Sequence, residues 1–307
     1  MDNGHFVSGI SYNQPEIYPS ALWNSNAITF ANSSILGTQS SNIFVDVTNA
    51  IYVSSLLHAV RMWSAADVNP RRNLSTLSGS SRSVFVTGNG DIYAGSGSDG
   101  QVVKWRLNDT NATLVMTASG SCSSLFFDIN STLYCAIETQ HKIVKRFLGN
   151  NNTTALPIVA GNGLAGSLST MLNVPRGIFV SRSFNLYVAD SGNDRVQLFP
   201  FGQLNATTIV GSGAPGTITL DCPTAVILDA NENLFIADGN NHRIIGSGPN
   251  GFQCVVGCTG VGGPASDQLL NPQSLAFDSL GNLFVLDKNN NRIQKFLLAT
   301  RYCSKYS

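Results

Sequence analysis

The sequence carries little charge. Of its 307 residues 12% are charged, and 18 basic residues balance 18 acidic ones. A typical soluble domain has about 25% charged residues, so Ser, Thr, Asn and Gly must form much of this surface. A neutral surface lacks the basic area that neutralises phosphates, which argues against binding of nucleic acid.

Long apolar stretches are also missing. No run approaches the roughly 20 apolar residues needed to cross a bilayer, so we expect no membrane span. Residues 1–20 have neither the basic region nor the apolar core of a signal peptide. Either a signal has been removed from this sequence or the protein is not secreted.

Several enzyme motifs are absent. The sequence has no G-x-S-x-G elbow, no P-loop and no dinucleotide-binding fingerprint. It has no C-x-x-C pair, which argues against a zinc ribbon or a thioredoxin-type site. We therefore expect neither a cofactor nor catalytic residues.

What the chain does contain is a repeated unit of short apolar runs. In residues 172–199, Gly, Ser, Asn and Asp separate three such runs, a pattern typical of an antiparallel meander. Two clear copies follow it and three weaker ones precede it. The first run of the six units ends at Asp46, Thr87, Asp128, Ser181, Asp229 and Asp278.

These six units, 41 to 53 residues apart, contain about four strands each and show no helical period, which predicts a β-propeller. The last unit lacks its fourth strand, and residues 27–30 look like an orphan one. We expect this N-terminal strand to pair with residues 292–297 and close the ring. An open ring would expose an unpaired strand edge.

The units resemble NHL repeats through the segments ADSGNDRVQLF, ADGNNHRIIG and LDKNNNRIQKF. The resemblance is strong over residues 160–299 and weaker over residues 41–159. It implies an all-β, six-bladed propeller over residues 27–299, preceded by an extension (1–26) and followed by a tail (300–307).

In a propeller the first strands line the central tunnel. Five positions before each residue that ends a first run, the side chain is usually polar, and we predict that these side chains form a ring at the tunnel mouth, the default ligand site. The alternative is that any wet tunnel must be polar. The predicted ring is Ser41, Arg82, Ser123, Arg176, Thr224 and Gln273.

Three units place an aspartate and an arginine on either side of a four-residue turn, where the two side chains can meet across the hairpin. We interpret these pairs as structural, because no second acid or base recurs beside them. The pairs are Asp190 with Arg195, Asp238 with Arg243, and Asp287 with Arg292.

Three histidines, His58, His141 and His242, fall in alternate units. The NHL-like amidating lyases hold zinc with three histidines, which lie where first strands begin. The corresponding positions here contain no histidine, so the resemblance does not extend to a zinc site.

The six cysteines allow fifteen disulfide patterns, with buried free thiols as the alternative. Cys122 and Cys135 fall toward one end of a single hairpin. Cys222 precedes the first strand of one unit and Cys258 follows the fourth strand of the same unit, so we expect both on the tunnel-mouth side. We predict the bonds Cys122–Cys135 and Cys222–Cys258, which require Cα atoms roughly 4.4–6.8 Å apart.

Asn-x-Ser/Thr sequons mark candidate glycosylation sites on exposed turns, with polar turn composition as the alternative. Two of them are Asn32 and Asn130. The other six are predicted between third and fourth strands: Asn73, Asn108, Asn111, Asn151, Asn152 and Asn205.

These features predict an extracellular, non-enzymatic binding or adhesion propeller whose tunnel mouth takes a protein or glycan ligand. One alternative is a structural subunit of a glycosylated extracellular assembly, and another is a metal-dependent lyase or hydrolase. Residues 5–23 contain aromatics and prolines but belong to no blade. We hypothesise that they dock on a neighbouring copy and form a filament, the alternative being a tail that packs on its own blade or is disordered.

Overall fold

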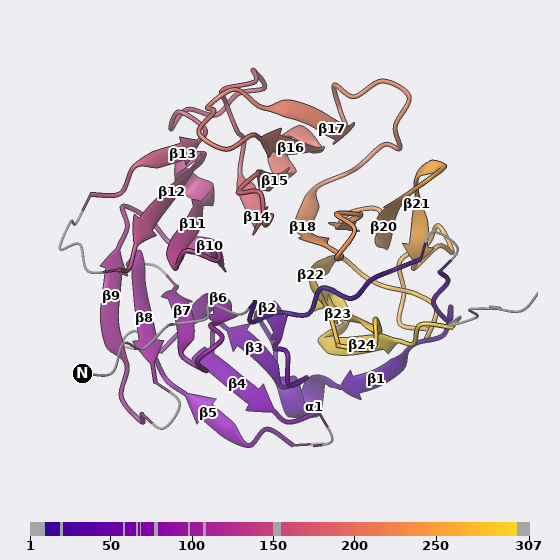
Figure 1. Cartoon of the computed structure of the whole chain (residues 1–307). Coiled ribbons are helices and arrows are strands. Elements are labelled where there is room, and N and C mark those ends of the chain that lie inside the picture. Colours follow the sequence, from indigo (N-terminus) through magenta and orange to yellow (C-terminus); the bar gives the residue numbers. More distant parts are fainter. Residues whose placement is uncertain are drawn as a thin grey trace, which may run out of the picture.

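The computed structural model describes residues 10–18, 21–57, 59–65, 67, 69–76, 79–97, 99–106, 109–149 and 155–299. These residues form six four-stranded antiparallel sheets, arranged as blades around a central axis (Figure 1). The six-bladed β-propeller predicted from the repeats is confirmed.

Within each blade the first strand lies nearest the axis and the fourth lies at the periphery (Figure 1). Blade 1 contains β2 (Ser40–Val45), β3 (Ile51–Ser55), β4 (Ala59–Trp63) and β5 (Arg72–Leu74). Blade 2 contains β6 (Ser81–Val86), β7 (Ile92–Ser96), β8 (Gln101–Trp105) and β9 (Thr113–Thr117). Blade 3 contains β10 (Cys122–Phe127), β11 (Thr132–Ile137), β12 (Lys142–Phe147) and β13 (Ile158–Ala160).

The second half of the ring repeats this plan. Blade 4 contains β14 (Pro175–Val180), β15 (Leu186–Asp190), β16 (Arg195–Phe199) and β17 (Thr207–Gly211). Blade 5 contains β18 (Pro223–Leu228), β19 (Leu234–Asp238), β20 (Arg243–Gly248) and β21 (Gly251–Val256). Blade 6 contains β22 (Pro272–Phe277), β23 (Leu283–Asp287), β24 (Arg292–Phe296) and, as its outer strand, β1 (Ile28–Ala31).

The predicted ring closure is therefore confirmed. β1 pairs antiparallel with β24, with Ile28 opposite Lys295 and Thr29 opposite Gln294. A short helix that we did not expect, α1 (Ser33–Leu36), then leads into blade 1. The described residues contain no helix with the length and apolar character needed to cross a membrane.

The recurring aspartate at the end of the first strand forms the first hairpin turn. In blade 1 the Asp46 carboxylate accepts hydrogen bonds from the backbone N–H groups of Thr48 (2.8 Å) and Ala50 (2.9 Å). Asp128, Asp229 and Asp278 accept the equivalent pairs of bonds in blades 3, 5 and 6. Such side-chain-to-backbone bonds favour aspartate in tight turns.

The Asp–Arg pairs form as predicted in blades 4, 5 and 6, with N–O distances of 2.7–2.9 Å. Their carboxylates are fully buried. In blade 4, Arg195 Nε binds Asp190, while Nη1 donates to the Ser167 carbonyl (2.8 Å) and Nη2 donates to the Leu168 carbonyl (3.3 Å). Each arginine thus joins a hairpin to the loop that precedes its own blade, which is a structural role.

The predicted disulfide Cys122–Cys135 is present, and it joins β10 to β11 with the Cα atoms 5.2 Å apart. The prediction of Cys222–Cys258 is wrong. Cys258 is bonded to Cys254 with a Cα separation of 5.8 Å, and the Cys222 thiol is free.

The reason for this error is the radial position of the two residues. Cys222 precedes β18, the innermost strand of blade 5, whereas Cys258 follows β21, the outermost (Figure 1). Three strand spacings, about 14 Å, separate these strands. Both cysteines lie at the mouth end of the blade, but their Cα atoms are too far apart for a bond. Cys303 lies outside the described residues.

The N-terminal extension packs on its own propeller. Residues 11–17, here termed the floor segment, cross the end of the tunnel at which the first strands finish. Asn13 Nδ2 donates to the carbonyls of Asp46 in blade 1 (2.8 Å) and Phe277 in blade 6 (3.2 Å). Gln14 Nε2 donates to a carbonyl of blade 5 (3.3 Å).

The described part of residues 5–23 packs on its own chain, as in the alternative given for this extension. Ile17 and Trp23 are buried in the core of their own chain, and Trp23 Nε1 donates to the Gly281 carbonyl (2.9 Å). The filament stays a prediction, because an element that packs within one chain can also be exchanged between identical chains. Its other residues lie outside the described part of the chain.

Candidate functional site: the tunnel cavity

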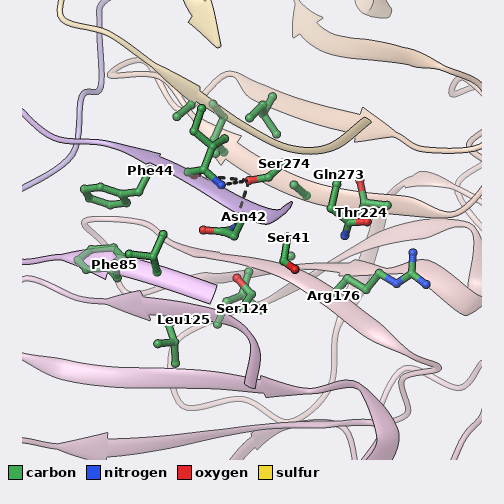
Figure 2. Close-up of a pocket in the computed structure, with 18 of the residues that line it drawn as sticks. Ser41, Asn42, Phe44, Phe85, Ser124, Leu125, Arg176, Thr224, Gln273 and Ser274 are labelled. Carbon is green, nitrogen blue, oxygen red and sulfur yellow. Dashed lines mark hydrogen bonds between the residues drawn. The ribbon is translucent and has the colours of Figure 1, made fainter. Parts of the chain in front are cut away.

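The tunnel holds a cavity of about 490 Å³, lined by residues of all six first strands. The end at which the first strands begin is here termed the mouth. Figure 2 shows Arg176, Thr224 and Gln273 toward one end of the cavity and Phe44 and Phe85 toward the other. All six residues predicted for the mouth line this cavity: Ser41, Arg82, Ser123, Arg176, Thr224 and Gln273.

Positive charge gathers at the mouth. Glu138, which opens the 3-10 helix η1 (Glu138–Gln140), lies between the two predicted arginines. Its carboxylate is 2.8 Å from Arg82 Nη1 and 3.9 Å from Arg176 Nε. Lys288, which opens η3 (Lys288–Asn290), adds a third cation and donates to Gln273 Oε1 (3.2 Å). Three cations therefore face one carboxylate.

The charges perturb one another. Partial burial lowers the pKa of the Lys288 ammonium, and the nearby charges of Arg176 and Arg82 lower it further. The Arg82 Nε–H is buried and has no hydrogen-bond acceptor among the described residues. A negatively charged group placed at the mouth would offset the repulsion among these cations.

Sequence reasoning missed Glu138 and Lys288. Both are the first residue after the second strand of their blade, at the mouth end of the antiparallel hairpin. The equivalent residue is Ser191 in blade 4 and Gly239 in blade 5, so no recurring residue type marks the position. Antiparallel geometry was the available signal, because a second strand must end where the first begins.

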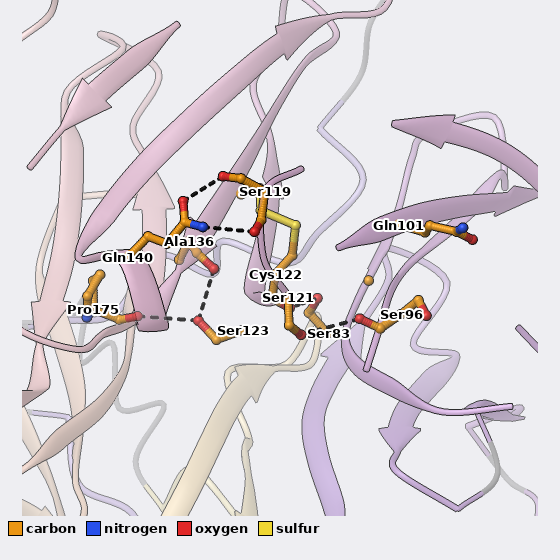
Figure 3. The surroundings of a disulfide bond; sticks show 12 residues. Ser83, Ser96, Gln101, Ser119, Ser121, Cys122, Ser123, Ala136, Gln140 and Pro175 are labelled. Atoms are coloured by element: carbon orange, nitrogen blue, oxygen red, sulfur yellow. Dashed lines mark hydrogen bonds between the residues drawn. A yellow bond between two sulfur atoms is a disulfide. The ribbon is translucent and has the colours of Figure 1, made fainter. Parts of the chain in front are cut away.

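Two of the predicted mouth residues connect blades. The Ser123 hydroxyl lies within hydrogen-bonding distance of the carbonyls of Ala136 (3.1 Å) and Pro175 (3.3 Å), the second in the next blade (Figure 3). The Thr224 hydroxyl donates to the Pro272 carbonyl of blade 6 (2.8 Å) and is almost fully buried. Their hydroxyl hydrogens are thus already engaged, which leaves Ser41, Gln273 and the two arginines as the ligand-facing groups of the predicted ring.

The layer below the ring is made of small residues, as expected where six backbones converge. Gly177 shows why: a Cβ there would lie 2.5 Å from the Ala225 Cα of the next blade. The Ser274 hydroxyl lies 3.3 Å from the backbone N–H of Ile43, whose hydrogen bond it accepts across the junction of blades 6 and 1. These short side chains leave the cavity open between the mouth and its deeper part.

Deeper in the tunnel the wall is apolar, and we term this part the chamber. One ring consists of one aliphatic residue per blade: Ile43, Val84, Leu125, Ile178, Val226 and Leu275. The next residue along each strand forms a second ring: Phe44, Phe85, Phe126, Phe179, Ile227 and Ala276. Adjacent phenyl rings of the second set have centroids 4.7–5.3 Å apart.

Tyr12 of the floor segment lies against these rings. Its ring centroid is 6.2 Å from that of Phe85, 5.3 Å from that of Phe126 and 5.4 Å from that of Phe179. These phenylalanines belong to blades 2, 3 and 4, whereas Asn13 and Gln14 bind blades 1, 5 and 6. The floor segment thus contacts every blade and covers the chamber at the end opposite the mouth.

The histidines lie away from the cavity. His141 Nδ1 accepts the backbone N–H of Val174 (3.1 Å), and His242 Nδ1 accepts that of Asn271 (3.2 Å), each at the start of the following blade. His58 lies outside the described residues. No three His, Cys, Asp or Glu side chains among the described residues are grouped as metal ligands.

The sequons are mostly placed as predicted. Asn111 lies between β8 and β9, and Asn205 lies between β16 and β17; both are exposed. Asn73 does not lie between strands. It is inside β5, opposite Arg61, because the fourth strand of blade 1 begins at Arg72, earlier than expected. Asn73 is nevertheless exposed on this edge strand.

The other two sequons within the described residues lie elsewhere on the surface. Asn32 caps α1 by accepting the Ser34 N–H (3.1 Å), and Asn130 lies on the turn between β10 and β11. Both are exposed. The remaining predicted positions, Asn108, Asn151 and Asn152, lie outside the described residues.

Comparisons with known proteins agree with this architecture. Residues 269–296 match the NHL repeat. No curated protein sequence matches the chain. A Bacteroides thetaiotaomicron protein of unknown function has a similar structure, with a TM-score of 0.70 at 16% identity over 89% of this chain and 76% of its own.

Two further solved structures share the fold. One is an auxiliary nutrient binding protein from Bacteroides ovatus, with a TM-score of 0.65 at 15% identity over 95% of this chain and 76% of its own. The other is virginiamycin B lyase from Staphylococcus aureus, with a TM-score of 0.61 at 10% identity over 91% of this chain and all of its own. At these identities the likeness concerns the fold and not the activity. The chain is therefore a six-bladed β-propeller whose sixth blade matches the NHL repeat.

Proposed function

We propose that this protein is an extracellular, non-enzymatic binding propeller that takes a negatively charged ligand at its tunnel mouth. The observation that carries the proposal is the cluster of Arg82, Arg176 and Lys288 around a single carboxylate. Like charges gathered in a concave site raise the free energy of the empty protein, and a bound anion lowers it. Arginine also presents the planar donor geometry that suits a carboxylate.

A binding role fits the chemistry of the site better than a catalytic one. Among the cavity residues that the structure describes, Glu138 is the one carboxylate, and it is engaged by two arginines. General acid–base catalysis usually needs a positioned group with a free proton or a free lone pair. An ion-paired Glu138 is better suited to set the spacing of the arginines.

The two disulfides indicate an oxidising environment, and they support the extracellular part of the proposal. Exposed sequons such as Asn111 and Asn205 add support, since glycans require surface positions. The ligand would then be an acidic group of an extracellular protein, glycan or small molecule.

Binding of matched ligand pairs tests this function. The pairs are a uronic-acid oligosaccharide with its neutral counterpart, and a glutamate-containing peptide with its glutamine version, measured by calorimetry. At least one acidic member should bind more tightly than its neutral partner. Arg82→Gln and Arg176→Gln should each weaken that binding about tenfold or more, because a hydrogen bond to a charged group contributes roughly 1.5–3 kcal/mol.

Arg182→Gln is the matched control. Arg182 is exposed and follows β14, the strand that carries Arg176 near its start. It therefore lies at the opposite end of the tunnel, and its loss should leave affinity unchanged. Equal binding of acidic and neutral ligands, or equal sensitivity to all three arginines, contradicts the proposal. Chemical conversion of a bound ligand would favour a lyase or hydrolase instead.

A further inference from the structure

We propose that the tunnel binds an amphipathic anion, that is, a carboxylate whose head lies at the mouth and whose apolar chain or ring enters the chamber. This inference rests on the proposed function, since it uses the same mouth, and it adds the class of ligand. It is carried by the order of side chains along the tunnel axis.

That order is polar, then small, then apolar. The mouth presents Arg82 and Arg176, and the next layer has side chains no larger than asparagine. Below these lie two apolar residues from every blade, ending in the phenyl rings of blades 1 to 4. A ligand with one charged end and one apolar end matches this sequence of layers in a single orientation.

The closed lower end makes the chamber a binding space instead of a channel. Tyr12 packs on three of the phenyl rings, and Asn13 holds the floor segment to blades 1 and 6. A molecule that enters from the mouth therefore reaches an aromatic surface and stops. The cavity volume of about 490 Å³ lies within the range of small-molecule sites.

A fully hydrophilic anion would leave this wall unused. Such a ligand would make no apolar contact with the aliphatic and phenyl rings, although burial of apolar surface favours binding. An apolar molecule without a charged head would bury the wall but leave the three cations of the mouth with Glu138 as their one counter-charge among the described cavity residues. Only the combination uses both parts of the cavity.

Straight-chain carboxylates test the inference directly. Dissociation constants are measured by calorimetry for butanoate, hexanoate, octanoate and decanoate, and for the neutral alcohols of the same lengths. Each added methylene that enters the chamber should tighten binding about fourfold, from the transfer free energy of a CH₂ group. The gain should stop when the chamber is full, and each alcohol should bind more weakly than its carboxylate.

Variants at the two ends of the cavity should act differently. Arg82→Gln should weaken every carboxylate by the same factor and leave the gain per methylene unchanged. Ala276→Phe places a fifth phenyl group in the second ring and should end the gain at a shorter chain. Ile227→Phe serves the same purpose if the first variant does not fold, and Arg182→Gln is the control expected to change nothing.

Nuclear Overhauser contacts in the unaltered protein give a readout independent of folding in the variants. The terminal methyl group of octanoate should contact phenyl protons of the chamber. If affinity is the same at all chain lengths while Arg82→Gln still weakens binding, the mouth binds anions but the amphipathic ligand is wrong. Nuclear Overhauser contacts of the methyl group with the outer surface of the propeller would also overturn the inference of an amphipathic ligand. If no straight-chain carboxylate binds while the uronic-acid oligosaccharide or the glutamate-containing peptide does, this inference fails and the proposed function stands; if none of them binds, both fail.

Discussion

Arg195 joins two segments of blade 4 that are far apart in the sequence. It neutralises the fully buried carboxylate of Asp190, and its guanidinium also donates to the carbonyls of Ser167 and Leu168. Only 7% of the Arg195 side chain is exposed. Because neither charge can be solvated by water, the two side chains depend on each other.

Replacing this arginine should therefore be costly. Arg195→Met leaves a buried carboxylate without its partner and should lower the free energy of unfolding by about 3–5 kcal/mol. Chemical denaturation followed by circular dichroism measures the change. Arg195→Lys keeps the charge but loses the forked geometry. Its free energy of unfolding should lie between those of the unaltered protein and of Arg195→Met.

Arg71→Met is the matched control, because Arg71 pairs with Asp67 at the surface with 62% of its side chain exposed. That variant should change stability by less than about 1 kcal/mol. A similar small effect at Arg195 would mean that the buried pair is not a main contributor to the stability of blade 4.

Lys288 leads to a prediction about pH. Its pKa is lowered from the ordinary value of 10.5, chiefly by partial burial. A lysine whose pKa is lower in the folded than in the unfolded protein disfavours folding while it is charged. The cost is present at neutral pH and disappears as pH rises through the folded pKa toward 10.5.

Lys288→Gln should accordingly be at least as stable as the unaltered protein at pH 7, although it loses affinity for anions. The difference in unfolding free energy between the two proteins should shrink as pH rises toward 10.5. Urea denaturation at several pH values measures it, with Lys145→Gln, on an outer part of blade 3, as the comparison. A loss of stability at pH 7 on replacing Lys288 would contradict the idea of a mouth strained by like charges.

Among the elements, β1 and the floor segment close the ring in two different ways. β1 completes the outer edge of blade 6, whereas the floor segment holds the six inner strands together at one end of the tunnel. Deleting residues 1–26 should remove the floor segment and the buried Trp23 but leave β1, and deleting residues 1–36 should remove β1 as well. Each step should lower the melting temperature, and each should cost several kcal/mol, comparable to losing two or three core side chains.

Adjacent residues in the extension provide a finer test. Trp23→Ala should cost about 3–5 kcal/mol, because the indole is buried against Phe235 and Phe277. Leu22→Ala should cost less than about 0.5 kcal/mol, since Leu22 is 63% exposed. Equal melting temperatures for these two variants would mean that the extension does not stabilise the propeller.

The elements also show what could be predicted from the sequence. The blades could be predicted because the units repeat: a turn aspartate such as Asp46 recurs at the same place in four units. Knowing that place located Arg82 and Arg176 by counting. The floor segment has no repeat, so nothing in the local pattern indicated that Tyr12 would lie against three blades. The expected bond between Cys222 and Cys258 was wrong because it rested on the end of the blade at which each cysteine lies. It did not take into account the distance between the first and the fourth strand.

For the whole molecule, the extracellular proposal predicts a pattern of modifications. Protein from a eukaryotic secretory host should carry N-glycans at exposed outer turns, above all at Asn111 and Asn205. Peptide mapping before and after enzymatic deglycosylation identifies the occupied sites. The same maps without reduction should contain the linked peptides of Cys122–Cys135 and Cys254–Cys258. Unmodified asparagines together with reduced cysteines would contradict secretion.

The floor segment also bears on how the chain is made. Asn13 hydrogen-bonds Phe277, which lies 264 residues later. At a synthesis rate of about 5–20 residues per second, roughly 13–53 s pass before that partner leaves the ribosome. During this time Ile17 and Trp23 lack the residues of blades 5 and 6 that bury them, so a nascent chain exposes these two side chains until its last blade appears.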